Sequence, residues 1–132
     1  MEERVARCRC GGVEARCRGE PVRVSVCHCL SCQRRSGSAF AVQARFARDD
    51  VAILGATRTF DSVGDEGNRT RFLFCPACGS TIAYTLQSNP DLVAVPVGAF
   101  ADPAFPPPSY SVYEERKHAW VAVVGENVQH ID

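Results

Sequence analysis

The stretch Cys27–Cys32 carries the densest group of metal-binding side chains in the chain, because three thiols fall within six residues. Two further cysteine pairs occur, in the segments Cys8–Cys10 and Cys75–Cys78. Seven of the eight cysteines therefore have the spacing of thiolate ligands to a metal ion. The N-terminus has no apolar stretch typical of a secretion signal, so the thiols are expected to stay reduced. This pattern predicts metal ligands rather than a disulfide framework.

The first predicted site joins the two outer pairs. On an extended strand, residues two apart point to the same side, so Cys8 and Cys10 can bind one ion. In the turn from Cys75 to Cys78, Pro76 favours a tight bend, and a glycine follows that tolerates a positive φ. This turn needs a second ligand pair, and Cys8 with Cys10 matches it best in kind. We expect a closed four-thiolate site with a structural zinc, although spacing alone allows other partitions of the cysteines.

Cys27, Cys29 and Cys32 are left for a second site. All three could face one metal and leave the fourth position to water or an incoming ligand, as in catalytic zinc sites. Alternatively, Cys17 could complete a second closed site, but it has no partner at ligand spacing and lies between two arginines. We favour the open site, in which the three cysteines bind a second, labile zinc and carry the catalytic step.

Polar residues beside the second site are candidates for binding the substrate. Arg34 and Arg35 could bind ligand carboxylates bidentately, or could be two solvated arginines on a polar turn. Ser36 and Ser38 could supply hydroxyl donors to a ligand, or could serve only to form a turn. His28 points away from both neighbouring sulfurs if its strand is extended, so a role as a proton carrier is favoured over one as a ligand.

Short strands dominate the expected secondary structure, because apolar and polar residues alternate and turn residues recur about every ten positions. One helical turn is expected at Leu30–Ser36, ended by Gly37. Loops are expected at Ser62–Asn68 and at the proline-rich Ala101–Ser109. The expected strands are Arg4–Cys8, Val13–Cys17, Val22–Val26, Ala39–Phe46, Val51–Leu54, Thr57–Phe60, Thr70–Phe74, Ser80–Leu86, Leu92–Phe100, Tyr110–Tyr113 and Trp120–Val124. This pattern predicts one all-β domain over residues 1–132, a sandwich or a barrel with little helix.

The overall charge argues against two classes of partner. Fifteen basic and fifteen acidic side chains cancel, and no basic stripe is present, so nucleic-acid binding is not expected. The longest apolar run, Leu92–Phe100, is interrupted by proline and glycine and is too short to span a bilayer. We expect a cytoplasmic protein without membrane or nucleic-acid partners; the oligomeric state cannot be inferred from the sequence.

Together, the cysteine spacing and its context resemble the glutathione-dependent formaldehyde-activating enzyme family. The resemblance extends from Cys8 to about Val123. The segments that carry it are Cys8–Gly11, Cys27–Cys32, Ser36–Phe40, Phe74–Gly79, Val97–Pro103 and Lys117–Val121.

This resemblance implies a compact Mss4-like β-sandwich of several short antiparallel sheets. It also implies a structural zinc on Cys8, Cys10, Cys75 and Cys78, and a labile zinc on the three cysteines of Cys27–Cys32. The implied activity is that of a carbon–sulfur lyase, the reversible addition of a thiol such as glutathione to formaldehyde or a related small aldehyde, giving S-hydroxymethylglutathione. Cys17 lies outside the family motif and is treated as a free thiol. The alternative hypothesis is a non-enzymatic zinc-stabilised β-domain that binds a partner protein.

Overall fold

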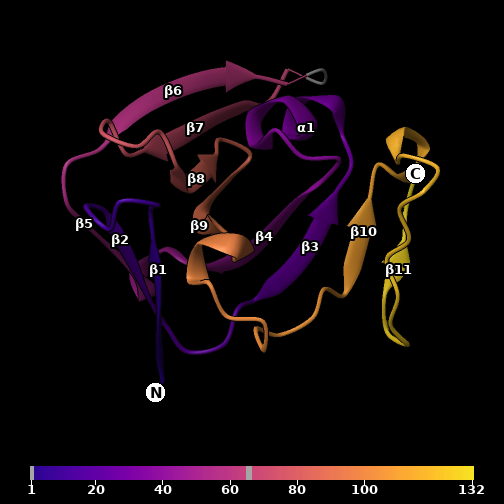
Figure 1. The fold of residues 1–132 in the computed structure, drawn as a ribbon, viewed down its shortest axis with the longest axis horizontal. Helices are drawn as coiled ribbons and strands as arrows, with labels where there is room; N and C mark the ends of the chain where they lie inside the picture. The colour runs from indigo at the N-terminus through magenta and orange to yellow at the C-terminus, as the bar shows by residue number, and fades with distance from the viewer. Residues whose placement is uncertain (1, 65–66) are drawn as a thin grey trace.

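The computed structural model describes residues 2–64 and 67–132, and most of its regular structure is β-strand (Figure 1). One α-helix, α1 (Leu30–Ser36), and three short 3-10 helices, at Arg48–Asp50, Val97–Phe100 and Glu114–Arg116, accompany the strands in these residues. The strands are β1 (Glu3–Arg7), β2 (Glu14–Arg18), β3 (Arg23–Cys27), β4 (Ala41–Ala47), β5 (Val51–Leu54), β6 (Arg58–Val63), β7 (Arg69–Phe74), β8 (Thr81–Leu86), β9 (Asn89–Pro96), β10 (Tyr110–Val112) and β11 (Gln129–His130). The predicted all-β class is confirmed.

The strands form two sheets. A three-stranded sheet has the order β1-β2-β5, and an eight-stranded sheet has the order β11-β10-β3-β4-β9-β8-β7-β6. Figure 1 shows β1, β2 and β5 at one end of the molecule and β10 and β11 at the other. Most pairings are antiparallel, as expected, but β10 runs parallel to both β3 and β11. The proline-rich segment before β10 brings the chain back across the molecule, which a parallel pairing requires.

The hydrophobic core lies where the two sheets pack against each other. The smaller sheet contributes the buried residues Ala6, Ala15 and Cys17, and the larger sheet contributes one face of its central strands. On that face, Phe46 of β4 pairs with Val93 of β9, and both are buried. Alternate residues of the same strands point to the opposite face of the large sheet, where α1 and the three cysteines of Cys27–Cys32 lie. The fold therefore separates an apolar core from a polar face.

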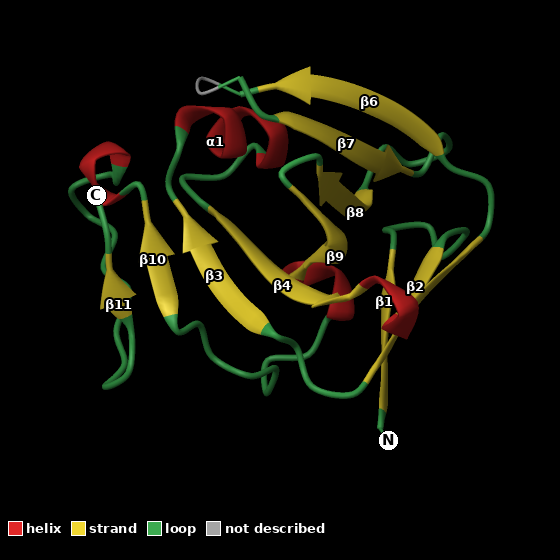
Figure 2. Ribbon diagram, turned by 180° about the vertical axis from the view of Figure 1, so that it is seen from behind, coloured by secondary structure: helices red, strands yellow, loops and turns green. Residues whose placement is uncertain are grey.

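Helix α1 begins and ends where the sequence indicates. Cys29 is its N-cap, and the Cys29 Sγ accepts a hydrogen bond from the Cys32 backbone N–H at 3.3 Å. Gly37 ends the helix with a φ of 67°, and its N–H donates to the Gln33 carbonyl at 2.9 Å. The helix covers the predicted range Leu30–Ser36, which amounts to about two turns and not the one expected. Figure 2 shows α1 directly after β3 in the chain and beside β7.

Three expected elements differ from the structure. The strand expected at Leu92–Phe100 stops at Pro96, and Val97–Phe100 is a 3-10 helix instead. The strand expected at Trp120–Val124 is absent, because this segment, in which Val121 alone is buried, pairs with no neighbouring strand among the described residues, and the last strand is β11. The expected loop Ser62–Asn68 is shorter than predicted at its first end, since β6 continues to Val63; residues 65–66 of that loop lie outside the described residues. No helix in the described part of the chain is long and apolar enough to cross a membrane.

Candidate metal centres and the adjoining sheet face

The four outer cysteines come together although they lie far apart in the sequence. The Sγ atoms of Cys8, Cys10, Cys75 and Cys78, here called the four-sulfur group, all lie within 4.8 Å of one another. The Cys8–Cys10 sulfurs are 3.6 Å apart and the Cys10–Cys75 sulfurs are 3.7 Å apart. A tetrahedral zinc with Zn–S bonds of about 2.3 Å separates its sulfurs by about 3.8 Å. These sulfurs therefore fit a closed tetrahedral metal site.

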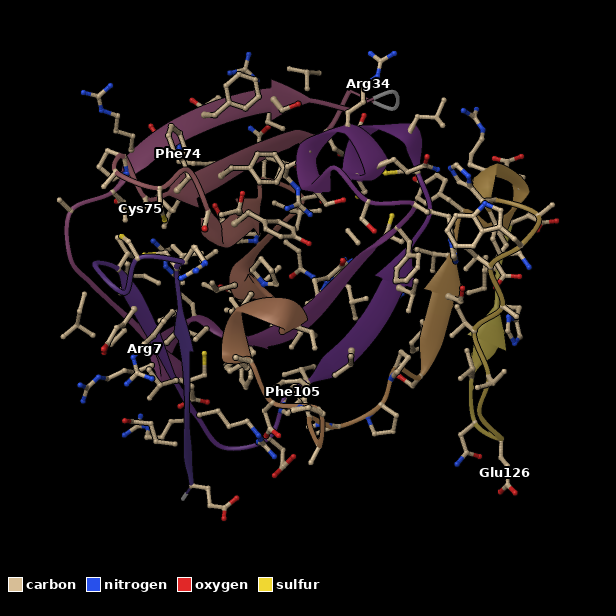
Figure 3. All side chains as sticks on the ribbon, in the orientation of Figure 1. Arg7, Arg34, Phe74, Cys75, Phe105 and Glu126 are labelled. Atoms are coloured by element: carbon tan, nitrogen blue, oxygen red, sulfur yellow. The ribbon has the colours of Figure 1, made fainter. Side chains whose placement is uncertain are left out.

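Backbone hydrogen bonds shape the two loops that hold this group. After β1, the Gly11 N–H donates to the Cys8 carbonyl at 3.0 Å, and the Val13 N–H lies 3.2 Å from the Cys8 Sγ. Between β7 and β8, the Gly79 N–H donates to the Cys75 carbonyl at 2.8 Å. Gly79 has a φ of 79°, so the positive φ expected after the second pair is present. Figure 3 shows Cys75 at the tip of this turn, on the side of the molecule that carries β1.

Hydrogen bonds favour the thiolate form of one member of the four-sulfur group, Cys78, whereas those from the neighbouring sulfurs raise the pKa of Cys10. Ser80 Oγ lies 3.4 Å from Cys78 Sγ. The Ser80 hydroxyl, followed by backbone N–H groups, lowers the pKa of Cys78 to about 5. The same Ser80 Oγ accepts a hydrogen bond from the Arg9 N–H at 3.1 Å, which joins the two loops. A cysteine that is already ionised near neutral pH is a ready ligand for a soft or borderline cation.

The three central cysteines form a second group. The Sγ atoms of Cys27, Cys29 and Cys32, here called the three-sulfur group, lie within 4.8 Å of one another. Cys27 is the buried last residue of β3, and Cys29 and Cys32 lie half-buried at the start of α1. The strand end and the first helical turn thus direct three sulfurs to one point, and no other ligand atom completes the group within the described residues.

The three sulfurs share their protons unequally. Hydrogen bonds from Cys27 and Cys32 lower the pKa of Cys29 to about 2, and the Cys32 N–H supports the same thiolate. In turn, the hydrogen bonds to its two neighbours raise the pKa of Cys32, and hydrogen bonding to Cys29 raises the pKa of Cys27. These shifts favour the thiolate at Cys29 and the protonated form at Cys27 and Cys32. A metal ion would replace those two protons.

Cys17 does not complete the three-sulfur group. It belongs to neither group of sulfurs, and its side chain is fully buried in the core between the two sheets. Burial raises the pKa of the Cys17 thiol to about 12. The Cys17 Sγ lies 3.9 Å from the Ala15 carbonyl oxygen. Cys17 is therefore a protonated core residue. This agrees with the sequence, in which Cys17 has no second cysteine at the spacing of a metal-ligand pair.

His28 lies between two ligand candidates in the sequence but belongs to neither sulfur group. Its side chain is fully buried, and its Nε2 lies 2.8 Å from the Ser111 Oγ of β10. Its Nδ1 is buried and has no hydrogen-bond partner among the described residues. Burial lowers the pKa of His28, which keeps the imidazole neutral. The histidine thus connects the cysteine loop to β10.

The four candidate substrate residues occupy different environments around α1. Arg34 is exposed and, in Figure 3, extends away from the sheet. The Arg35 guanidinium lies 5.2 Å from the ring centroids of both Phe72 and Tyr84. Ser36 Oγ donates to the Cys32 carbonyl at 2.8 Å, and Ser38 is exposed. Only Arg35 is fixed over the same sheet face as the cysteines.

A further set of polar residues on that face was not singled out from the sequence. Gln43 and Arg45 of β4 and Tyr84 of β8 point to the same side as Cys27, because their strands are in register. Gln43 and Tyr84 are buried. Burial raises the pKa of Tyr84, and the charges of Arg35, Cys32 and Cys27 also act on it. The signal in the sequence is the alternation Gln43-Ala44-Arg45-Phe46, which places two polar residues opposite core residues.

A cavity in the described structure lies elsewhere. Its volume is about 460 Å³, and residues around the four-sulfur group and the Val97–Phe100 helix line it, among them Cys8, Ser80 and Phe100. A closed four-ligand site has no free position for a reacting group, so this cavity is not where the cysteines would do chemistry.

A family model described as glutathione-dependent formaldehyde-activating enzyme matches residues 3–116. The chain belongs to this family. The match includes both sulfur groups, the helix α1 and the sheet face beneath it. The resemblance noted in the cysteine pattern is therefore confirmed.

One solved structure supports the same fold. The crystal structure of a Rhodobacter sphaeroides protein is 25% identical to this chain, with a TM-score of 0.57, and the match covers 72% of this chain and 85% of that one. No curated protein matches the chain significantly.

Proposed function

We propose that this protein is a zinc-dependent carbon–sulfur lyase that adds a thiol such as glutathione to formaldehyde or a related small aldehyde. The observation that carries the proposal is the three-sulfur group, in which three converging cysteines leave one position of a tetrahedron open. Membership in a family named for formaldehyde activation with glutathione supports the choice of reaction. The four-sulfur group would hold the second zinc, with a structural role.

The donor set of each group suits zinc. Thiolates are preferred zinc ligands, and the Cys8–Cys10 and Cys10–Cys75 sulfur separations match a tetrahedral site. Zinc bound by Cys27, Cys29 and Cys32 would favour the deprotonated form of a substrate thiol as the fourth ligand. Three thiolates and one divalent cation carry a net charge of −1. Arg35, which lies over Phe72 and Tyr84, would offset that charge.

The reaction is a reversible addition. A new bond forms between the thiolate sulfur and the carbonyl carbon, and the carbonyl π electrons move to oxygen, which then takes up a proton. In the reverse direction, the hydroxyl loses its proton and the carbon–sulfur bond breaks. Arg34, Arg35, Ser36 and Ser38 are the candidates to donate hydrogen bonds to the developing oxyanion. Arg35 is the best placed of these, because it alone is held over the sheet face.

The direct test combines the purified zinc-loaded protein, formaldehyde and a series of thiols. Formation of the S-hydroxymethyl adduct would be followed by NMR exchange spectroscopy. We expect the protein to accelerate exchange between free and adduct thiol, and the Cys29→Ser variant to lose the acceleration. No acceleration with any thiol would reject the reaction.

The alternative, a non-enzymatic partner-binding domain, rests on the exposed apolar residues Trp120 and Val124, which are 76% and 84% exposed. Metal analysis separates the two functions. The lyase should bind about two zinc ions and respond to thiols at one of them, whereas a binding domain should be indifferent to thiols.

A further inference from the structure

A continuous row of side chains crosses the eight-stranded sheet on the face that carries the three-sulfur group. Strand register places these residues directly opposite one another from β3 to β6: Arg23, Arg45, Ala94, Tyr84, Phe72 and Phe60. We call this set the Arg45 row. Cys27 lies four residues after Arg23 on the same strand, so its side chain points to the same face. The row and the three sulfurs therefore share one face of the sheet.

Two unpaired cations lie at one end of this row. Arg23 and Arg45 face each other across β3 and β4, and like charges directly opposite destabilise a sheet. Neither forms an ion pair within the described part of the chain, although Arg4, Arg7, Arg16, Arg18, Arg71 and Arg116 all pair with acidic residues. Burial and the charge of Arg45 lower the pKa of Arg23. An anion between the two would relieve this repulsion.

Hydrogen-bonding groups on the same surface are also unsatisfied. The Arg45 Nε is buried without a hydrogen-bond partner. The same is true of the Oε1 of Gln43, which lies two residues before Arg45 on β4 and therefore nearer to the cysteines. Arg23 is held in place, because its Nε donates to Ser25 Oγ at 2.8 Å and its guanidinium lies 3.9 Å from the Tyr110 ring centroid. Buried polar groups in proteins are normally hydrogen-bonded, so an orphaned guanidinium nitrogen beside a second arginine indicates a missing ligand.

The spacing suits an elongated thiol. A strand rises about 3.3 Å per residue, so the Gln43 row lies about 7 Å and the Arg45 row about 13 Å from the row of Cys27. A three-residue peptide spans at most about 10 Å, and an arginine side chain can reach over the remainder. A peptide-sized molecule with its sulfur at the three-sulfur group could thus extend its far end towards Arg45.

We propose that Arg45, together with Arg23, forms a carboxylate-binding subsite that selects anionic, peptide-sized thiols for the three-sulfur group. The proposal rests on the proposed thiol chemistry and adds to it a basis for substrate choice. A guanidinium binds a carboxylate through two parallel hydrogen bonds, which gives both affinity and orientation. Arg34 and Arg35, the arginines that sequence position favoured, would then act near the sulfurs and not at the far end of the substrate.

The test compares glutathione with its diethyl ester, which keeps the thiol but masks both carboxylates. Binding to the zinc-loaded protein would be measured by isothermal titration calorimetry. We expect the wild-type protein to bind glutathione at least tenfold more tightly than the ester, and Arg45→Gln to reduce this ratio to about one. Arg23→Gln should lower the ratio of glutathione affinity to ester affinity, but not to one. Arg58→Gln, an exposed arginine of β6 far along the sheet, is the matched control and should leave the ratio unchanged.

Two further results decide the outcome. Arg45→Lys should keep part of the ratio, because it retains charge without the bidentate geometry. A purely structural role of Arg45 would instead weaken the binding of both ligands by the same factor and leave the ratio unchanged in both Arg45 variants. Equal binding of both ligands to the wild-type protein, or an unchanged ratio in Arg45→Gln, would overturn the subsite while leaving the thiol chemistry standing. Failure of both ligands to bind would overturn the proposed function together with the subsite.

Discussion

The Sγ of Cys10 lies 3.7 Å from the Sγ of Cys75, although 65 residues separate them in the chain. Cys10 follows the first strand of the three-stranded sheet, and Cys75 follows β7 of the eight-stranded sheet. The four-sulfur group therefore joins the two sheets at one end of the core that they enclose. A metal ion at this point would close a long loop of chain and fix the packing of one sheet on the other.

Replacing Cys75 with serine should unfold or strongly destabilise the protein. The change removes one of four ligands, and structural zinc contributes roughly 10 kcal/mol or more to the folding of small domains. That exceeds the total stability of most domains of this size. Circular dichroism, thermal unfolding and zinc content of the purified variant would measure the effect. A Cys75→Ser protein with the wild-type melting temperature would show that the four-sulfur group does not hold the fold.

Replacing Cys29 with serine should leave the fold intact and remove only the second zinc. Serine is a favourable N-cap, so it can replace the Cys29 Sγ as the acceptor for the Cys32 N–H and preserve α1. We expect zinc content to fall from about two to about one per chain and thiol addition to be lost. The melting temperature should change far less than in Cys75→Ser. Unfolding of Cys29→Ser would show that the three-sulfur group is structural.

The two sulfur groups could be predicted from the sequence because their information is local. Within each segment, local features fix where the sulfurs point: the cysteine spacing, the end of a strand, a proline in a turn or a glycine after it. The order in which the strands pair contributes little. The same holds for α1, whose end at Gly37 follows from a positive φ. The joining of the outer pairs was favoured, since each pair supplies half of a tetrahedron, but spacing alone also allowed other partitions of the cysteines.

Strand pairing between distant segments could not be predicted in this way. Nothing in the local pattern of Tyr110–Val112 indicates that it lies parallel to β3, about 85 residues earlier. The strand expected at Trp120–Val124 is apolar at every position in the sequence, but among the described residues it has no neighbouring strand to pair with. Arg45 was missed for the same reason. Alternation shows which face of the sheet it occupies, but only the register of four neighbouring strands places it in line with Arg23 and Tyr84.

Gly55→Ala should destabilise the protein by at least about 2 kcal/mol. Gly55 has a φ of 103°, and a Cβ there would collide with the Gly12 carbonyl oxygen and come within 3.1 Å of the Val13 Cα. Because backbone atoms make these contacts, a side-chain rotation cannot relieve them. Urea unfolding of the zinc-loaded protein would measure the loss. The control is Gly37→Ala, where φ is also positive but no atom lies within 4 Å, and the cost should be only about 1 kcal/mol.

Ser111→Ala should destabilise the protein by about 1–3 kcal/mol. Ser111 is fully buried, and its Oγ is the sole described hydrogen-bond partner of the His28 ring. Removing it leaves both ring nitrogens buried without partners, and an unsatisfied buried group costs this much. Urea unfolding would give the change in the free energy of unfolding. The control is Ser88→Ala, in the exposed turn before β9, whose stability should lie within about 0.5 kcal/mol of wild type. Equal stability of the two variants would mean that the His28 contact contributes nothing.

Cys17→Ala should alter how stability depends on alkaline pH. The pKa of Cys17 is raised by burial from 9.0 in the unfolded chain to about 12 in the folded protein. A raised pKa means that the folded state retains a proton which the unfolded state releases. The associated stability is therefore fully present below about pH 9 and is lost as the pH rises towards 12. Cys17→Ala lacks this loss, so its stability relative to the wild-type protein should improve by about 2 kcal/mol between pH 8 and pH 10.5. Urea unfolding at both pH values measures the difference, and a constant offset between the two proteins would show that Cys17 ionises as freely in the core as in water.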